Sequence, residues 1–216
     1  MKKRLLSLAL SLALSLSLMP MGAAAAGRSF VDVKKSDWFY AGVQYTVDKG
    51  LFKGVSADRF APGEEMTRAM VVQTLYALAG KPSVKKTHQF PDVKDSDWFS
   101  DAVAWAVKNG VASGYDDGRF APDDTISREQ FAVMLHGYEK KPASDKPLNF
   151  ADAAAVSGWA KPAMRWASER GLMNGVGGNY IAPQSTATRA EGAVIMMRFH
   201  QQVSSRPGGD NQLPIG

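Results

Sequence analysis

The sequence contains three copies of one pattern, and this repetition restricts the possible folds more than any other feature. A short motif recurs at intervals of 60 residues, as Phe30-Val31-Asp32-Val33, Phe90-Pro91-Asp92-Val93 and Phe150-Ala151-Asp152-Ala153. The third copy then carries one inserted residue, and later landmarks stay in register. We place the repeats at residues 27–80, 86–139 and 146–200. Residues 201–216 are polar, contain Pro and Gly, and are expected to form a disordered tail.

The first half of each repeat is predicted to be a helix that ends at a glycine. A Ser-Asp pair such as Ser96-Asp97 is a typical helix start. Trp98, Ala102 and Trp105 then recur at the spacing of one helical face. The glycines suited to a left-handed C-cap are Gly50, Gly110 and Gly171. The following loop should hold Asp58, Gly118 and Asn179 in the left-handed conformation and insert Phe60, Phe120 and Ile181 into the core.

The second half of each repeat is predicted to be a helix capped by a hydroxyl side chain. The caps are Thr67, Ser127 and Thr188. Gln130 and Glu191 stand three residues after their caps and complete a capping box, whereas Met70 cannot. Two short helices bury too little apolar surface alone, so the three repeats are expected to share one core. The predicted fold class is mainly all-α.

An arginine follows each of these caps, at Arg68, Arg128 and Arg189. The N-terminus of a helix carries a partial positive charge, so a cation there is unfavourable unless an anion compensates it. Free N–H groups, a hydroxyl and a guanidinium together suit a carboxylate or phosphate ligand. An alternative stays open at this point, in which each arginine pairs with an internal carboxylate, such as Asp32, Asp92 or Asp152.

Two further residue types recur at equivalent positions. Trp38, Trp98 and Trp159 stand at the predicted starts of the first helices. We expect them to be core residues first, because large aromatic side chains dominate cores, with one ring edge free to stack on a sugar. Gly54, Gly114 and Gly175 are interpreted as turn residues, and the missing Cβ also lets a ligand approach the backbone.

The repeats resemble the S-layer homology family. The motifs that carry the resemblance are Phe-x-Asp-Val, Asp-Trp-Phe, a Gly-x-x-x-Gly pair, Arg-Phe-Ala-Pro and Thr-Arg-Ala-Glu. The last stands intact as Thr188-Arg189-Ala190-Glu191 and is altered to Thr67-Arg68-Ala69-Met70 and Ser127-Arg128-Glu129-Gln130. The resemblance covers about residues 28–200. The third repeat departs from the pattern in its loop, at Gly177-Gly178, and lacks an Asp before Trp159.

The resemblance implies a pseudo-threefold assembly around a central three-helix bundle. It also implies grooves between repeats that bind an anionic secondary cell-wall polysaccharide, often pyruvylated through a ketal. The arginines would then contact the ketal carboxylate, while the cap hydroxyls, the second glycines and the tryptophans would line the sugar. The expected function is non-covalent anchoring to the bacterial cell wall, and other S-layer or wall proteins are possible partners. A secreted adaptor or wall-coating spacer is the alternative.

The N-terminus is typical of an export signal. Lys2-Lys3-Arg4 precede an apolar run from Leu5 to Met19, and small residues follow up to Ala26. The run is shorter than the roughly 20 residues that a membrane-spanning helix requires. We therefore expect residues 1–26 to be removed, with no membrane insertion afterwards, and a secreted protein at the cell wall. No passenger domain is expected beyond the repeats.

Composition excludes several other function classes. The formal net charge is +5, and three of these positive charges belong to the predicted signal, so a nucleic-acid partner is not expected. The chain has no cysteine and therefore no disulfides. The three histidines have no matching repeat positions and no metal spacing, and Asp116-Asp117-Gly118 lacks the rest of a calcium loop. No carboxylate pair recurs in all three repeats, so neither an enzyme nor a cofactor is expected.

Overall fold

The computed structural model describes residues 29–86 and 90–206, and within them the regular elements are helical. The α-helices are α1 (Tyr40–Asp48), α2 (Arg68–Leu78), α3 (Ser100–Lys108), α4 (Arg128–Tyr138), α5 (Lys161–Glu169) and α6 (Arg189–Ser204). Two 3-10 helices, η1 (Ala153–Ala155) and η2 (Gly158–Ala160), precede α5. The predicted all-α class is confirmed. The predicted signal peptide lies outside the described residues, as does the last part of the predicted tail.

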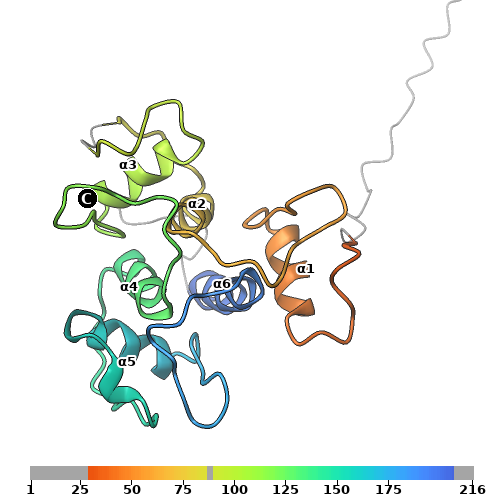
Figure 1. Cartoon of the computed structure of the whole chain (residues 1–216), viewed down its shortest axis with the longest axis vertical. Helices are drawn as coiled ribbons and strands as arrows, with labels where there is room; N and C mark the ends of the chain where they lie inside the picture. The colour runs from red at the N-terminus through yellow and green to blue at the C-terminus, as the bar shows by residue number, and fades with distance from the viewer. Residues whose placement is uncertain (1–28, 87–89, 207–216) are drawn as a thin grey trace, which may run out of the picture.

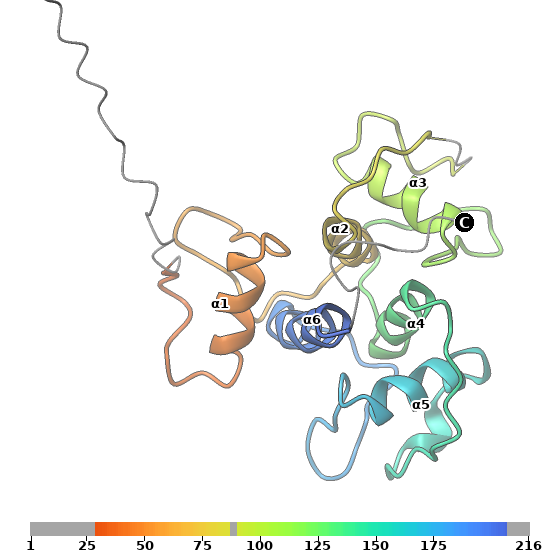
Figure 2. The same ribbon diagram turned by 180° about the vertical axis from the view of Figure 1, so that it is seen from behind.

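The second helices of the three repeats lie at the centre of the molecule. Figures 1 and 2 show α2, α4 and α6 nearly end-on in the middle, with α1, α3 and α5 arranged around them. Each outer helix packs on the second helix of another repeat, since α3 contacts α2, α5 contacts α4 and α1 contacts α6. One core cluster includes buried side chains from all three repeats, as expected. The exact pseudo-threefold symmetry stays a prediction.

The chain segments that lead into the central helices hydrogen-bond to one another in a closed circle. The backbone N–H of Met66 donates to the carbonyl of Ala187, Ala187 donates to Ile126, and Ile126 donates back to Met66, at 2.8, 3.0 and 2.8 Å. The first residue of each central helix also donates its backbone N–H to a neighbouring repeat. We call residues 64–69, 124–129 and 185–190 the inner ring. Because every repeat gives and receives bonds there, no repeat completes the ring alone.

Close backbone approach joins the first and last helices. A Cβ added to Gly42 of α1 would lie 2.8 Å from the side chain of Val194 in α6. The hydroxyl of Tyr45 lies 2.7 Å from Nδ1 of His200, also across these two helices. Only glycine allows this spacing without displacing α6, because a real Cβ is essentially never found so close to another atom. The N-terminal repeat is thereby joined directly to the C-terminal one.

Several local predictions are confirmed. Phe60, Phe120 and Ile181 have no exposed surface. Gly50, Gly110 and Gly171 have φ values of 68°, 68° and 63°. The full capping box is present in α4 and α6, whereas Thr67 of α2 accepts only the N–H of Met70. Gly118 and Asn179 are left-handed, at φ values of 82° and 63°. Asp58 is not, so that part of the loop prediction is wrong.

The predicted start of the first helices is wrong by several residues. In repeat 1 the carboxylate of Asp37 accepts the N–H of Lys34 at 2.7 Å, which closes a turn behind it instead of capping a helix ahead. Helix α1 then begins at Tyr40, and no side chain caps it. Repeat 2 shows the same arrangement between Lys94 and Asp97.

The predicted tail also begins too early. Helix α6 continues to Ser204, and Arg206 forms an ion pair with Glu139. The sequence after residue 200 looked unstructured because it is polar, but its partners lie far away along the chain, in repeats 2 and 3. One of them is the carbonyl of Arg170, which accepts from Gln202 at 2.8 Å.

Candidate functional site

Three grooves open between the repeats, with volumes of about 490, 410 and 220 Å³. Each is lined by an arginine from the start of a central helix in one repeat, a glycine loop from the next repeat and a tryptophan from the remaining one. The lining residues are Arg128, Gly175 and Trp38 in the first, Arg189, Gly54 and Trp98 in the second, and Arg68, Gly114 and Trp159 in the third. We name them the Arg128, Arg189 and Arg68 grooves. Nine of the twelve residues predicted for the site thus line the three grooves.

The arginines lie deep in these grooves, with only 4–6% of their surface exposed. Nε of Arg189 donates to the carbonyl of Phe60 at 2.8 Å, and its Nη2 donates to the carbonyl of Lys53 at 2.8 Å. Arg68 makes the same two bonds to Phe120 and Ser113, and Arg128 to Ile181 and Asn174. Each arginine therefore connects two repeats through backbone carbonyls, which supply part of the negative potential that its position requires.

Burial lowers the pKa of all three guanidinium groups below its usual value. Arginine nevertheless stays charged at neutral pH, because its unperturbed pKa lies far above neutrality. Aromatic rings add to the setting, since the guanidinium of Arg189 lies 4.6 Å from the ring centroid of Phe60 and that of Arg68 lies 4.5 Å from Tyr115. The result is a partly desolvated cation at the base of each groove, where an anion is bound more strongly than at an open surface.

The alternative, in which each arginine pairs with an internal carboxylate, holds for Arg128, whose partner is Glu191. Among the described residues, none of the three arginines forms an ion pair with Asp32, Asp92 or Asp152. Each carboxylate accepts two backbone N–H groups of its own repeat, as Asp152 does from Ile181 and Ala182, both at 2.8 Å. Burial alone would raise the pKa of Asp32 and Asp152, but these backbone donors hold it below its ordinary value. The aspartates therefore fix the loop that places the Phe or Ile plug, and they leave the arginines to other partners.

The expectation that the tryptophans are mainly core residues is also wrong. Trp38, Trp98 and Trp159 expose 67%, 62% and 59% of their surface. In repeats 1 and 2 the indole stands edge-on against the next residue, Phe39 or Phe99, at centroid distances of 5.4 and 5.2 Å. The phenylalanine goes inward and the tryptophan outward, because the turn before the helix separates the two side chains. An exposed aromatic face beside a buried cation suits a ligand with an apolar sugar face and an acidic group.

The glycines and caps have structural tasks within the protein. A Cβ on Gly54 would lie 2.6 Å from the ring of Phe30, and a Cβ on Gly114 would collide with Phe90. The side chains of Thr67, Ser127 and Thr188 accept the backbone N–H three residues later. The glycines line the grooves through their backbone, whereas the cap residues are not part of the groove lining.

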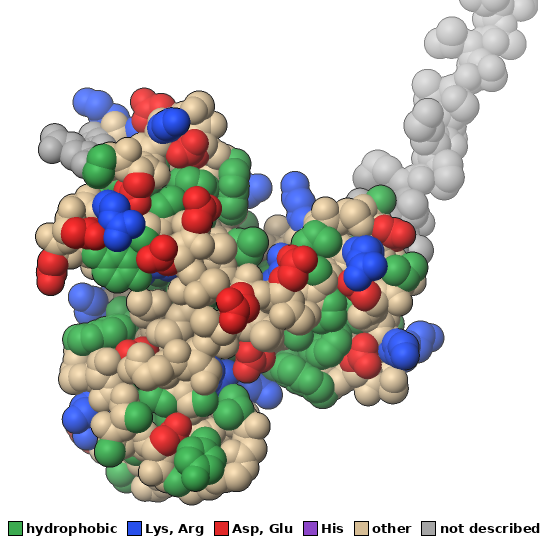
Figure 3. All heavy atoms as spheres, in the orientation of Figure 1, with side chains coloured by type: hydrophobic (Ala, Val, Ile, Leu, Met, Phe, Trp, Pro, Cys, Tyr) green, Lys and Arg blue, Asp and Glu red, His purple; other side chains and the backbone are tan. Residues whose placement is uncertain are grey.

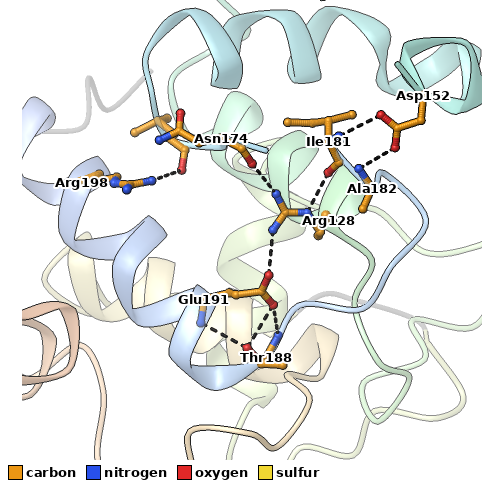
Figure 4. Close-up of polar contacts among 9 residues, drawn as sticks. Arg128, Asp152, Asn174, Ile181, Ala182, Thr188, Glu191 and Arg198 are labelled. Atoms are coloured by element: carbon orange, nitrogen blue, oxygen red, sulfur yellow. Dashed lines mark hydrogen bonds and ion pairs between the residues drawn. The ribbon is translucent and has the colours of Figure 1, made fainter. Parts of the chain in front are cut away.

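The Arg128 groove contains an ion pair that the other two lack within the described residues. Nη1 of Arg128 donates to Oε1 of Glu191 at 3.0 Å, and Oε2 of Glu191 accepts the backbone N–H of Thr188 at 2.8 Å (Figure 4). The same carboxylate thus caps α6 and neutralises the cation. Arg198 also lines this groove and donates to the carbonyl of Leu172 at 3.5 Å.

Sequence reasoning missed the residue three positions after each cap as a groove residue. Met70, Gln130 and Glu191 line the Arg189, Arg68 and Arg128 grooves respectively. Their variation within the Thr-Arg-Ala-Glu signature was visible, but it was interpreted only as capping chemistry. A helical side chain three positions after the cap points back toward the helix start, and this direction could have placed it beside the arginine of the preceding repeat.

No cluster of three or more potential metal ligands from His, Cys, Asp and Glu occurs within residues 29–86 and 90–206. In the same part of the chain, none of the helices combines the length and apolarity needed to cross a membrane. Figure 3 shows acidic and basic side chains interspersed over one face of the molecule. His136 is buried, and its Nε2 lies 2.8 Å from the carbonyl oxygen of Pro142.

Comparison with known proteins gives consistent matches. The S-layer homology domain matches residues 29–69, 89–132 and 149–193. The chain is 30% identical over 184 residues to S-layer protein sap of Bacillus anthracis, covering 83% of this chain and 22% of that protein. It is 29% identical over 196 residues to the surface-layer 125 kDa protein of Lysinibacillus sphaericus, covering 89% and 16%. Identity to exoglucanase XynX of Acetivibrio thermocellus is 29% over 182 residues, covering 82% and 17%.

The chain spans about a fifth or less of the length of these relatives. The domain match and the surface-layer relatives support a secreted, cell-surface location, which confirms the localisation expected from the sequence. Three matches in tandem, in the register of the sequence repeats and over more than half of the chain, leave one assignment: the protein belongs to the S-layer homology family.

Proposed function

We propose that the protein attaches non-covalently to the bacterial cell wall by binding an acidic wall polysaccharide in the grooves between its repeats. The observation that carries this proposal is the composition of the grooves, in which a buried arginine, a backbone-exposing glycine loop and an exposed tryptophan come from three different repeats. Because all three repeats contribute to every groove, binding requires the whole assembly.

The groove chemistry fits a sugar that carries a carboxylate. Two N–H groups of each arginine donate to carbonyls, and the remaining ones of Arg189 are available for a planar two-point contact with a carboxylate. The indole face offers an apolar platform for a pyranose ring. A pyruvate ketal combines a carboxylate with a rigid attachment to the sugar, and it is the acidic group that we propose here.

The range of relatives supports attachment as the shared role. Proteins with glucanase names and proteins with surface-layer names both contain the matched region as a small part of their length. A region found with such different companions is suited to attachment, and we propose no catalytic step for its residues.

The exposed tryptophans provide a test that does not disturb the fold. We expect the triple variant Trp38→Ala, Trp98→Ala, Trp159→Ala to lose at least about tenfold in affinity for purified cell walls, because stacking on an aromatic ring is worth about 1 kcal/mol or more per site. Tyr180→Ala is the matched control, since Tyr180 is 50% exposed and lines none of the three grooves. Co-sedimentation with walls measures binding, and circular dichroism measures folding.

Walls from which the ketal has been removed complete the experiment. We expect wild-type binding to fall on these walls as well. Unchanged binding by a folded triple tryptophan variant would contradict the groove proposal. Equal binding to walls with and without the ketal would contradict the acidic ligand and favour an adaptor or spacer role.

A further inference from the structure

The three grooves differ at the third residue of the central helix. This residue stands across the groove from the arginine of the preceding repeat. It is Met70 in the Arg189 groove, Gln130 in the Arg68 groove and Glu191 in the Arg128 groove. One side chain therefore sets whether the guanidinium meets an apolar group, a neutral amide or a carboxylate.

In the Arg128 groove, the positive charge of Arg128 is compensated by Glu191 of the protein itself. Both carboxylate oxygens of Glu191 accept hydrogen bonds, one from Arg128 and the other from the start of α6. The guanidinium and the carboxylate expose only 4% and 21% of their side-chain surface, so solvent screens the pair weakly. An acidic ligand in this groove would lie beside a fixed negative charge and would have to compete with it for Arg128.

The Arg189 groove has the opposite character. Arg189 meets no carboxylate within ion-pair distance among the described residues, and Met70 cannot compensate its charge. Asp32 and Glu64 act on Arg189 only at longer range, and neither lines the groove. Lys53 and Lys81 do line it, and both are exposed. Three cations and no acid thus surround about 410 Å³ of open volume.

The Arg68 groove is the smallest, at about 220 Å³. Tyr115 lies over the guanidinium, and its hydroxyl accepts a hydrogen bond from Nε2 of Gln130 at 3.1 Å. The side chains of Gln130 and Tyr115 are thus hydrogen-bonded to each other within the groove. An acidic group would have to break this contact to reach Arg68. The Arg128 groove has no such contact, because Val176 stands at the position of Tyr115.

We infer that the Arg189 groove is the main site for the acidic group of the ligand, and that the third residue of the central helix selects which grooves accept an anion. This inference rests on the proposed function. Met70 keeps the Arg189 groove open to anions, and Glu191 closes the Arg128 groove to them. The three grooves are then not equivalent sites, despite their common architecture.

The test exchanges the selecting residue between repeats. Met70→Glu recreates the Thr-Arg-Ala-Glu signature in repeat 1, and Met70→Gln is its uncharged match. Both variants complete a capping box at α2 and are expected to fold at least as well as the wild type. Titration calorimetry with soluble, ketal-bearing wall polysaccharide should show an affinity loss of about tenfold or more for Met70→Glu, because a charge-assisted contact is lost, and a much smaller change for Met70→Gln.

The reciprocal variant is Glu191→Gln, which retains an acceptor for the cap but removes the charge. We expect it to add a second, ketal-dependent binding event in the Arg128 groove. Equal affinities of Met70→Glu and Met70→Gln would overturn the inference while leaving the proposed function intact. Absence of ketal-dependent binding by the wild type would overturn the proposed function, and the inference with it.

Discussion

The inner ring and the tryptophan rim of the grooves lie close together but have opposite properties. Ring residues such as Met66, Ile126 and Arg189 are buried and bonded to another repeat. The rim residues Trp38 and Trp98 expose most of their surface, and each stands edge-on against a neighbouring Phe. The repeat motifs contain both kinds of residue, but the structure divides two tasks between them. The ring holds the repeats in place, and the rim is free to meet a ligand at little cost to stability.

Removal of the third repeat should have the largest effect, because it opens the ring. A chain truncated after Glu139 loses the carbonyl and N–H of Ala187 that join Met66 to Ile126. It also leaves α1 without α6. We expect no cooperative thermal transition by circular dichroism or calorimetry. A sharp transition in the truncated protein would show that two repeats form their own core and would contradict the shared ring.

Replacement of a ring arginine is the next largest change. Arg189→Ala should lower the free energy of unfolding by about 2–4 kcal/mol, since it leaves two carbonyls of another repeat without their charged donor. Because the arginine is structural, wall binding of this variant reports folding as well as contact. Urea unfolding gives the stability, with exposed Arg170→Ala as the control. A stability equal to the wild type would mean that these hydrogen bonds contribute little.

Asp152 should give an acid-sensitive contribution of about 1 kcal/mol or less, because its hydrogen bonds are partly open to solvent. The pKa of Asp152 is lowered in the folded state, so the protein holds this proton less tightly than the unfolded chain does. The stabilisation is therefore complete above the ordinary pKa of 3.8 and is lost as the pH falls through the lower folded value. Asp152→Asn should flatten the fall of the melting temperature between about pH 4 and pH 2.

Asp145→Asn, at an exposed linker position, is the control for this acid transition. If the slope of melting temperature against pH is the same for both variants, the backbone contacts of Asp152 do not govern acid stability.

The smallest effect on stability is expected at the rim. Trp98→Ala should change the free energy of unfolding by less than about 0.5 kcal/mol, because an exposed side chain away from special contacts contributes little. The same variant should weaken wall binding. A loss of stability comparable to that of Arg189→Ala would remove the distinction between ring and rim.

Features decided by local chemistry could be predicted from the sequence. The caps at Ser127 and Thr188 and the left-handed Gly50 depend only on neighbouring backbone, and the repeat pattern marked them. The burial of Phe60 followed from its position after a turn in every copy. The all-α class and the shared core followed from the repeat length and the short apolar faces.

Features decided by other repeats could not be predicted in the same way. The carbonyl partners of Arg68 lie 45 and 52 residues away, and sequence spacing does not reveal them. The arginines looked like uncompensated cations for this reason. The inward or outward direction of Trp98 and Phe99 was also not determined, because a turn breaks the helical spacing between Trp98 and Trp105.

The contact between α1 and α6 has a mechanical consequence. The first described helix, α1, packs on the last, α6, so the two ends of the folded region contact each other directly. A force that pulls the C-terminal end of α6 away from the rest of the folded region would act first on this contact between α1 and α6. Val194 of α6 packs closely on the backbone of α1 at Gly42, so the two helices must move apart before one can slide along the other. The resistance of the folded region to a force on α6 is therefore expected to depend on the contact between its first and last described helices.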